Sequence, residues 1–231
     1  MVEDAAGAIV TAAHGARTIG DYERNAFGAL RLAVGGDVFF LCRGGRIGAG
    51  ALGVEPGIAR RTIGRWRQYG EELAPVFCDA QASGGVSIDA AVLGDAFFAT
   101  RVYREFIRPH GGRCTMLGVV ALGQELLATI AVGRLGGSFA DRDRRTLAGL
   151  LPTLALAEAA VRRKGEVWAA LAPREREILG YLRLGYTNAQ IAIAIGTSVN
   201  TVRNQVASVL RKLGAANRAE AVALSLGHGP V

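Results

Sequence analysis

The 231-residue chain has few of the side chains that build metal sites, disulfide frameworks and hydrolytic active sites. Its three cysteines, Cys42, Cys78 and Cys114, are odd in number and widely spaced, which excludes a disulfide framework and a zinc knuckle. We interpret them as small buried side chains, with a redox-sensing thiol as the alternative. His110 lies close to Cys114, but no third orienting group accompanies the pair. We therefore expect no enzymatic activity, no metal and no cofactor.

Long hydrophobic runs are also lacking. No apolar run reaches the roughly 18 residues needed to cross a bilayer. The first 30 residues mix acidic and basic side chains, unlike the basic-then-apolar order of a secretion signal. We therefore expect a cytoplasmic protein without a membrane partner. Half of the residues are hydrophobic, which suffices for a packed core and excludes a disordered chain.

Positive charge is abundant, and arginine supplies nearly all of it. The formal net charge is +7, and lysine occurs only at positions 164 and 212. Residues 165–231 carry seven Lys or Arg against four Glu. A basic surface favours polyanions, and nucleic acid is the default partner.

The first two thirds of the chain predict a mixed α/β domain. Glycine pairs separate short apolar runs, as turns do between strands and helices. We expect helices over 14–32, 58–69 and 95–107, and hairpins over 37–52 and 114–134. This order predicts an antiparallel sheet with helices packed on it.

A long helix is expected from Phe139 to about Lys164, with Pro152 kinking or splitting it. Its leucine stripe either forms a dimer seam or packs on the domain's own sheet. Residues 162–166 are interpreted as a linker. The chain then divides into a sensor domain over 1–140, a connecting helix and linker over 141–165, and a helical domain over 166–231.

Four helices are expected in the last part of the chain. They run over 173–184, 187–196, 198–213 and 217–226. Thr187 and Gln190 fit a capping box at the start of the second helix, and Ser198 is a good N-cap for the third. Two short helices that meet at residues 196–198 are typical of a helix-turn-helix. A plain helical bundle with one basic face is the alternative.

The third of these helices has two different faces. Val202, Val206, Val209, Leu210 and Leu213 share one side. The opposite side carries Asn200, Arg203, Asn204, Ala207 and Arg211, and no acidic residue occurs between Thr197 and Leu213. An exposed face of arginine and asparagine without carboxylates suits the phosphate-lined groove of double-stranded DNA.

The run LAPREREILGYLRLGYTNAQIAIAIGTSVNTVRNQVASVLRKLGAANRAEAV resembles the LuxR-type (NarL/FixJ-like) DNA-binding domain of bacterial transcription regulators. The matching anchors are Pro173, Arg174, Glu175, Glu177, Gly185, Asn188, Ile191, Ala192, Gly196, Ser198, Thr201, Val202, Asn204, Leu210, Lys212, Leu213, Asn217 and Arg218. Five positions depart from the family pattern. Ala172 replaces a capping Thr or Ser, Gln190 a glutamate, Ala194 a basic residue and Gln205 a histidine, and Ala207 has no hydrogen-bonding group.

The resemblance implies a homodimer that reads an inverted repeat through the 199–213 recognition helix, with the fourth helix pairing two domains. It implies that Arg203, Asn204 and Ala207 occupy base-reading positions. Arg203 could read a guanine with two hydrogen bonds, with a phosphate contact as the alternative. The full set of residues expected at DNA is Thr187, Ser198, Asn200, Thr201, Arg203, Asn204, Ala207, Arg211 and Lys212. RNA polymerase is a further candidate partner of such a regulator.

The N-terminal part is similar to GAF/PAS-like sensors of other LuxR-type regulators over residues 103–109, the hairpin ending at Arg134, residues 139–143 and residues 150–152. A phosphate-receiver domain is rejected, because Lys164 and Lys212 lie outside any sensor core. An autoinducer-binding domain matches weakly, since the spacing of Trp66, Tyr69 and Asp79 differs from that family's pattern.

A small-molecule pocket in this domain would be mostly apolar with a few polar groups. The candidate lining residues, each of which could equally be ordinary core, are Trp66, Tyr69, Phe77, Phe97, Tyr103, Phe106 and Met116. Three hypotheses follow: a ligand-responsive regulator, a ligand-independent regulator whose N-terminal domain dimerises or binds partners, and a cysteine-based redox sensor. An enclosed pocket favours the first, a filled core the second, and an exposed Cys78 or Cys114 near arginine the third.

Overall fold

The computed structural model describes residues 2–16, 18–44, 46–48, 52–53 and 66–225. The chain forms two compact units, residues 1–160 and residues 161–231, here called the N-terminal unit and the C-terminal unit. Residues 58–65 of the helix expected over 58–69 lie outside the described residues.

A five-stranded antiparallel sheet forms the centre of the N-terminal unit, with the strand order β2-β1-β5-β4-β3. The strands are β1 (Val38–Arg43), β2 (Arg46–Ile47), β3 (Val86–Ile88), β4 (Cys114–Leu122) and β5 (Glu125–Arg134). The hairpin predicted over 114–134 is confirmed, because β4 and β5 pair from Cys114 opposite Arg134 to Leu122 opposite Glu125. The alternation of side chains along each strand gives the sheet two faces, and both are buried.

One face of the sheet is covered by α1 (Val2–Gly15), α2 (Ile19–Val34) and the first part of α6 (Asp141–Ala169). Gly118 of β4 lets α6 approach closely, since a Cβ at this position would meet Leu151 at 3.0 Å and Leu147 at 3.5 Å. Tyr22, Phe27 and Leu30 of α2 are fully buried in this layer. Their burial supplies the hydrophobic free energy that holds the helices on the sheet.

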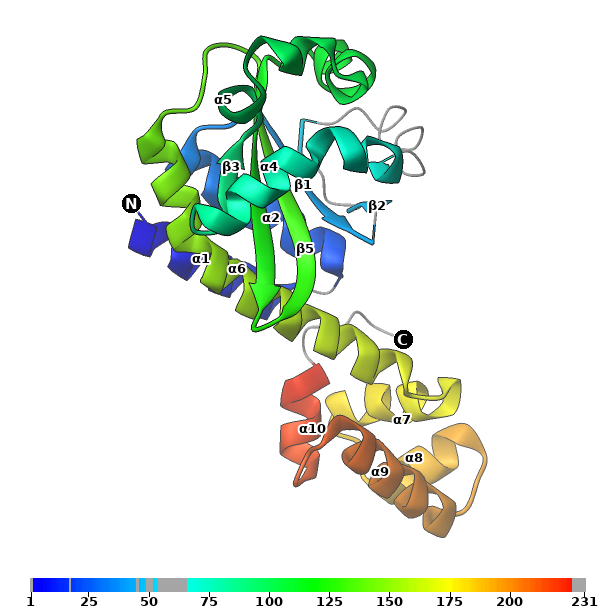
Figure 1. Ribbon diagram of the computed structural model, residues 1–231. Coiled ribbons are helices and arrows are strands. Elements are labelled where there is room, and N and C mark those ends of the chain that lie inside the picture. Colours follow the sequence, from blue (N-terminus) through cyan, green and yellow to red (C-terminus); the bar gives the residue numbers. More distant parts are fainter. Residues whose placement is uncertain (1, 17, 45, 49–51, 54–65, 226–231) are drawn as a thin grey trace. The chain divides into compact units, whose positions relative to one another are not determined.

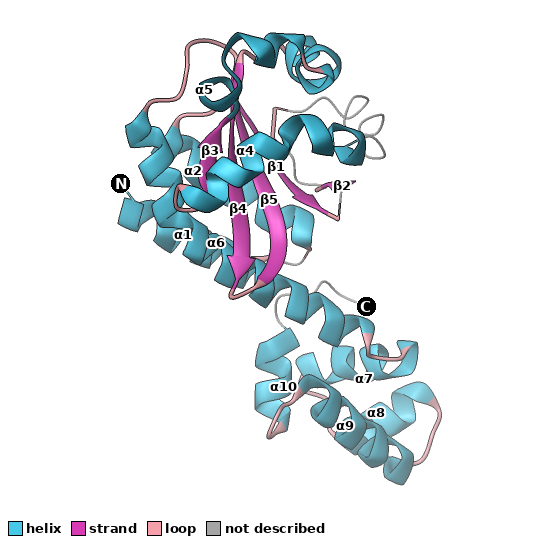
Figure 2. Cartoon of the chain, in the orientation of Figure 1, coloured by secondary structure: helices cyan, strands magenta, loops and turns pink. Residues whose placement is uncertain are grey.

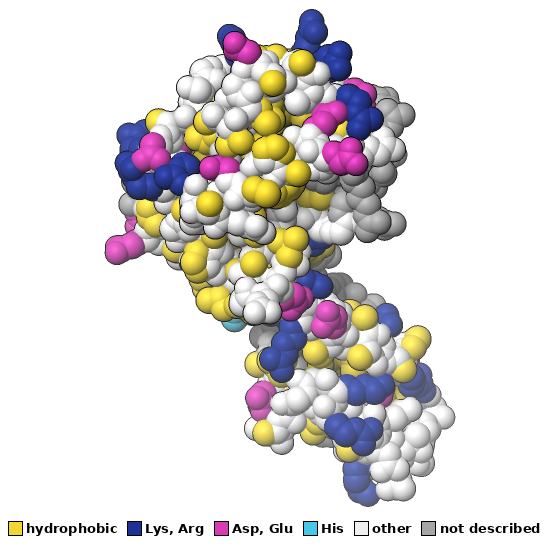
Figure 3. Space-filling view, viewed as in Figure 1, with side chains coloured by type: hydrophobic (Ala, Val, Ile, Leu, Met, Phe, Trp, Pro, Cys, Tyr) yellow, Lys and Arg dark blue, Asp and Glu magenta, His cyan; other side chains and the backbone are white. Residues whose placement is uncertain are grey.

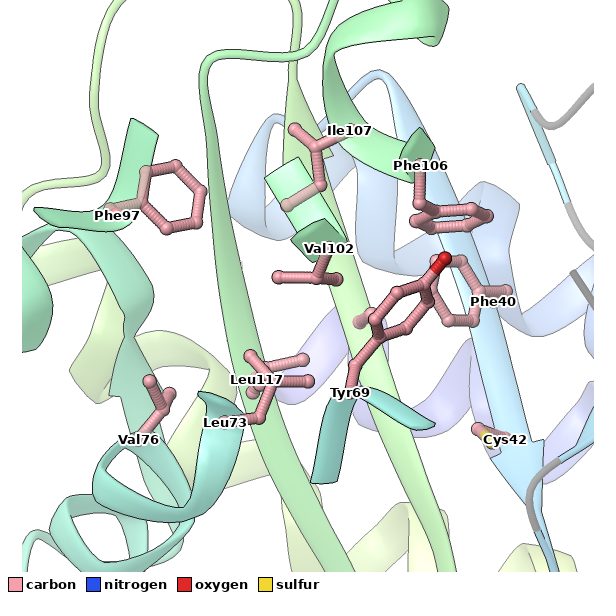
Figure 4. Close-up of a cluster of buried hydrophobic side chains, with 11 residues drawn as sticks. Phe40, Cys42, Tyr69, Leu73, Val76, Phe97, Val102, Phe106, Ile107 and Leu117 are labelled. Atoms are coloured by element: carbon pink, nitrogen blue, oxygen red, sulfur yellow. The ribbon is translucent and has the colours of Figure 1, made fainter. Parts of the chain in front are cut away.

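The other face carries η1 (Trp66–Tyr69), α4 (Gly70–Ala82), α5 (Asp89–Leu93) and three short helical segments, η2 (Gly94–Ala99), η3 (Tyr103–Ile107) and η4 (Arg108–His110). Figure 4 shows the core beneath them, which consists of Phe40, Cys42, Tyr69, Leu73, Val76, Phe97, Val102, Phe106, Ile107, Leu117 and Ala131. The predicted α/β architecture with an antiparallel sheet is therefore confirmed.

Several predicted boundaries are wrong. The helix expected over 14–32 corresponds to α2, which begins only at Ile19, where Thr18 and Asp21 form a capping box. Helix α1, over Val2–Gly15, was not predicted. The helix expected over 95–107 is divided at Thr100, whose hydroxyl bonds back to the carbonyl of Phe97 at 2.6 Å. Of the strand expected over 46–52, the structure describes β2 over Arg46–Ile47 and a bridge between Leu52 and Phe39, while residues 49–51 lie outside the described part of the chain.

Helix α6 is unbroken over 29 residues, although Pro152 lies inside it. A proline ring removes one backbone hydrogen bond but leaves the rest of a long, packed helix intact. Residues 162–166, expected as a linker, are helical. The boundary between the two units, at Ala160 and Val161, falls within this helix.

The C-terminal unit contains α7 (Pro173–Arg183), α8 (Asn188–Ile195), α9 (Val199–Leu213) and α10 (Arg218–Ser225), together with the end of α6. All four helices expected from the sequence are confirmed to within about two residues. The ends of these helices have clear sequence signals, which are Pro173 at the start of α7, the N-caps Thr187 and Ser198, and the terminal glycines Gly196 and Gly214.

Candidate nucleic-acid interface

A small apolar core holds α7, α8 and α9 together. Its members are Leu171, Ile178, Leu179, Leu182, Ile191, Ala192, Val202, Val209 and Ala221, all of which are buried. Leu171 precedes α7, and the other members come from α7, α8, α9 and α10. The core therefore fixes the orientation of α9, so that its polar side faces away from the core.

The turn between α8 and α9 is defined by backbone and caps. Gly196 ends α8 with φ of 67°, a left-handed conformation that glycine adopts without strain. Ser198 then caps α9, because its hydroxyl accepts the Thr201 N–H at 3.0 Å. At the other end of α8, Thr187 Oγ1 accepts the Gln190 N–H at 3.3 Å and Gln190 Oε1 accepts the Thr187 N–H at 2.8 Å. The predicted capping box is therefore confirmed, and two short helices meet at a tight turn.

The outer face of α9 is polar, basic and exposed. Arg203, Asn204, Ala207 and Arg211 follow one another at helical spacing, whereas Val202 and Val209 point into the core. All nine residues expected at DNA are exposed: Thr187, Ser198, Asn200, Thr201, Arg203, Asn204, Ala207, Arg211 and Lys212. Figure 3 shows Lys and Arg side chains spread over the visible surface of the C-terminal unit.

The Arg203 guanidinium is held within its own helix. Its Nη1 donates to Asn200 Oδ1 at 3.1 Å, one turn earlier. Such a contact restricts the arginine side chain before any base or phosphate is met, and so reduces the entropy lost on binding.

Lys212 has intramolecular partners. Its Nζ donates to Glu175 Oε2 at 2.6 Å and to the Ala170 carbonyl at 3.1 Å. Glu175 also accepts from the Ser208 hydroxyl at 2.8 Å. Burial by itself raises the pKa of Glu175, but its bonds to Lys212, the Ala172 N–H and Ser208 outweigh burial and hold the pKa below its usual value. The ion pair thus ties α7 to α9.

Two adjacent residues at the start of α7 reach both helices of the motif. Arg174 donates to the Ile195 carbonyl at the end of α8, at 2.8 Å, and to Glu177 at 2.6 Å. Glu175 accepts the Ala172 N–H at 2.7 Å, so half of a capping box persists although Ala172 has no capping oxygen. The sequence pattern did not identify Arg174, Glu175 or Ser208 as site residues, because the signal is a contact between helices.

The aromatic residues proposed for a ligand pocket are mostly core. Tyr69, Phe97 and Phe106 lie in the filled cluster of Figure 4, and Phe77 and Tyr103 pack against it. Met116 cannot share a pocket with them, because it lies on the same strand face as Gly118, which contacts α6. The side chain of Trp66 lies outside the described part of the chain.

A groove of about 700 Å³ opens between α4 and the sheet. Its described lining consists of Cys42, Gly44, Gly70, Leu73, Phe77, Gln81, Val119, Ala121, Gln124, Leu126 and Thr129. This set contains no charged side chain, and of the seven predicted ligand residues it includes Phe77. The groove therefore suits an uncharged, largely apolar molecule.

The cysteines lie in different surroundings. Cys42 and Cys114 are buried and Cys78 is exposed. Burial raises the pKa of the Cys114 thiol, which disfavours the reactive thiolate. Within the described residues no cluster of three His, Cys, Asp or Glu could hold a metal ion.

Residues 169–225 match the family of bacterial regulatory proteins called the luxR family. The C-terminal unit therefore carries a LuxR-family helix-turn-helix domain. Over 55 residues the chain is 51% identical to the probable transcriptional regulatory protein SgaR of Hyphomicrobium methylovorum, a match covering 24% of this chain and 26% of SgaR. Over 68 residues it is 34% identical to the response regulator VraR of Staphylococcus aureus, covering 29% of this chain and 32% of VraR. The chain thus matches about a quarter to a third of the length of these curated relatives.

Distant likenesses extend to the N-terminal unit. Escherichia coli SdiA gives a TM-score of 0.44 with 18% identity, over 91% of each chain. The ligand-binding domain of VqsR from Pseudomonas aeruginosa gives a TM-score of 0.48 with 14% identity, over 70% of this chain and 96% of that one. Among the described residues, every helix is too short or too polar to cross a membrane.

Proposed function

We propose that this chain is a bacterial transcription regulator that binds double-stranded DNA through α9. The carrying observation is the exposed face of α9, which presents arginine and asparagine without a carboxylate inside a LuxR-family domain. Arg203, Asn204 and Ala207 are proposed to face base edges. Thr187, Ser198, Asn200, Thr201, Arg211 and Lys212 complete the proposed DNA-contacting set. The protein is not an enzyme in this proposal and works in the cytoplasm.

The proposed target is an inverted repeat bound by a homodimer, because two-fold protein symmetry requires two matching half-sites. The domain limits proposed are 1–140 for a GAF/PAS-like sensor, 141–165 for a connecting helix and 166–231 for the DNA-binding domain. RNA polymerase is proposed as the partner that converts DNA binding into regulation.

Selection from randomised double-stranded DNA tests the proposal. We expect an enriched inverted repeat that Arg203→Ala binds with relaxed preference at one base pair per half-site, worth about 1–3 kcal/mol. Arg142→Ala removes the same charge from the N-terminal unit and should leave the preference unchanged. No enriched sequence, or a protein that stays monomeric on the enriched DNA, would contradict the proposal.

We further propose that a small uncharged molecule in the groove between α4 and the sheet modulates DNA binding. The volume and the uncharged lining of the groove support this proposal. Native mass spectrometry of protein purified from its own cytoplasm should show a dimer carrying such a molecule. An empty dimer that regulates normally would favour the ligand-independent alternative. A change in DNA affinity on oxidation, lost in Cys78→Ser, would favour the redox alternative, since Cys78 is exposed.

A further inference from the structure

Three charged side chains meet inside the N-terminal unit. Glu23 of α2 and Glu158 of α6 are both fully buried, and Arg43 of β1 lies between them with its side chain 22% exposed. Arg43 Nη2 donates to Glu158 Oε2 at 2.7 Å, Nε donates to the other oxygen of Glu158, and Nη1 donates to Glu23. Two helices and a strand are therefore joined through one guanidinium.

The position of Arg43 in β1 places this charged cluster next to the groove between α4 and the sheet. Cys42 and Gly44, the residues on either side of Arg43, both line the groove. Successive side chains of a strand point to opposite faces, and Cys42 belongs to the core beneath α4. The end of β1 thus contributes to the groove on one face while its arginine holds α6 on the other.

Helix α6 offers little freedom to absorb a movement of Arg43. Glu158 is bound through both carboxylate oxygens, and one turn earlier the Leu154 carbonyl lies 3.5 Å from the Tyr22 hydroxyl. Separating a buried carboxylate from its guanidinium leaves an uncompensated charge, which is strongly unfavourable. A displaced β1 end therefore carries Glu158 along. Glu158 lies three residues before Val161, the first residue of the C-terminal unit.

We propose that Arg43 is a relay, which transmits a change in the groove through Glu158 to the part of α6 that precedes the C-terminal unit. Its biological use rests on the proposed ligand-modulated function, whereas the mechanical coupling does not. The Glu23 carboxylate supports the relay by fixing the guanidinium from the side of α2.

A groove-filling substitution tests the relay without a ligand. Ala121→Trp places an indole on the groove wall, and Ala74→Trp is the matched control, because Ala74 is exposed on α4 and outside the groove lining. The readout is amide hydrogen exchange of residues 154–160 in the full chain. We expect Ala121→Trp to change this exchange about fivefold or more, the size of a typical coupling, and Ala74→Trp to leave it unchanged.

Ala121→Trp is then introduced into a protein that lacks the three charges around Arg43. Arg43→Met alone would leave buried carboxylates unpaired and could prevent folding, so the triple variant Glu23→Gln, Arg43→Met, Glu158→Gln removes all three charges together. In this background Ala121→Trp should change the exchange of residues 154–160 by less than about twofold, well under a typical coupling. Val119→Phe, a smaller addition on the same wall, replaces Ala121→Trp if that variant does not fold.

An equal change in both backgrounds would overturn the relay, and so would an unchanged segment 154–160 in the native background. DNA binding of the same proteins is measured in parallel. If neither the unsubstituted chain nor any variant binds DNA sequence-specifically, the proposed function is refuted. The coupling measured by amide hydrogen exchange is not affected by that result.

Discussion

A single ammonium group, that of Lys212, connects the first and third helices of the C-terminal unit. It is bound to Glu175 and to the Ala170 carbonyl, while its neighbour Arg211 is exposed and donates to Ser208 Oγ at 3.4 Å. Adjacent basic residues on one helix thus have different surroundings. Substitution of Lys212 should therefore lower stability as well as DNA affinity, whereas substitution of Arg211 should lower DNA affinity alone.

Lys212→Met should lower the free energy of unfolding of the C-terminal unit by about 1–2 kcal/mol, because it leaves the Glu175 carboxylate without its charged donor. Arg211→Met should leave stability within about 0.5 kcal/mol and instead reduce the salt dependence of DNA binding by about one unit of slope. Urea unfolding and titrations at several salt concentrations measure both. Equal losses of stability in the two variants would contradict this division.

Asp89 gives the N-terminal unit a pH dependence. Burial raises the pKa of this carboxyl to about 7, against the opposing effect of the Thr115 and Ala90 N–H donors. A carboxyl with a raised pKa in the folded state contributes stability below its unfolded pKa of 3.8, and that contribution is lost as pH rises toward 7. The unit should therefore become less stable between pH 4 and 7.

Asp89→Asn is the corresponding test. The amide keeps an oxygen acceptor for the Thr115 N–H but cannot ionise, so the decline between pH 4 and 7 should shrink by on the order of a few kcal/mol. Denaturant unfolding at pH 4 and pH 7 measures this change. Asp95→Asn, a substitution of an exposed carboxyl on the same side of the sheet, is the control. An undiminished pH dependence in Asp89→Asn would show that another group is responsible.

At the scale of elements, α6 is longer than the sequence predicts and is not split at its proline. Pro152 was predicted to kink or split the helix, and the split does not occur, because the helix continues to Ala169. Pro152 is exposed while Leu150, Leu151 and Leu154 are buried, so packing on the sheet compensates for the lost backbone hydrogen bond.

Pro152→Ala should stabilise the N-terminal unit by about 1–3 kcal/mol, because the helix regains a backbone N–H and loses a steric conflict with the preceding turn. Thermal unfolding measures the effect, and Thr153→Ala provides a control at the next position. A loss of stability would mean that the proline shapes α6 in a way that the sheet requires.

Elements with strong local signals were predictable. The hairpin of β4 and β5 follows from two apolar runs around Gly123, and the ends of α8 and α9 follow from caps and glycines. Helix α1 was missed, and the predicted start of α2 at residue 14 overlooked the capping residue Thr18, after which the helix begins at Ile19. Helix α4 was missed as well, since Pro75 inside it and its small residues give a weak pattern.

The residues of the candidate sites also differ in how well the sequence predicts them. The polar face of α9 was predictable because it depends only on helical spacing within one segment. The partners of Lys212 and the cluster around Arg43 join residues 20 to 115 positions apart, and no local pattern records such contacts. Six of the seven predicted ligand residues are aromatic, whereas the described lining of the groove consists mainly of small and aliphatic side chains.

At the scale of the whole molecule, each unit has its own hydrophobic core. Two separate cores predict two unfolding transitions in calorimetry. Ile191→Ala should lower one of them and Val76→Ala the other, each by a cost of about 2–4 kcal/mol, because both side chains are fully buried. A single transition that both variants shift equally would show that the units unfold together.

The absence of carboxylates from α9 also affects how such a protein would be distributed between DNA and solution. A recognition surface without negative charge is attracted to the phosphates of every sequence, and the chromosome offers far more ordinary sites than target sites. Most copies would then be stored on unrelated DNA, and the pool free in solution would be small. Occupancy of a target would respond to the amount of chromosome per cell as well as to synthesis of the protein, and a vacant target would be reached by short transfers along the DNA.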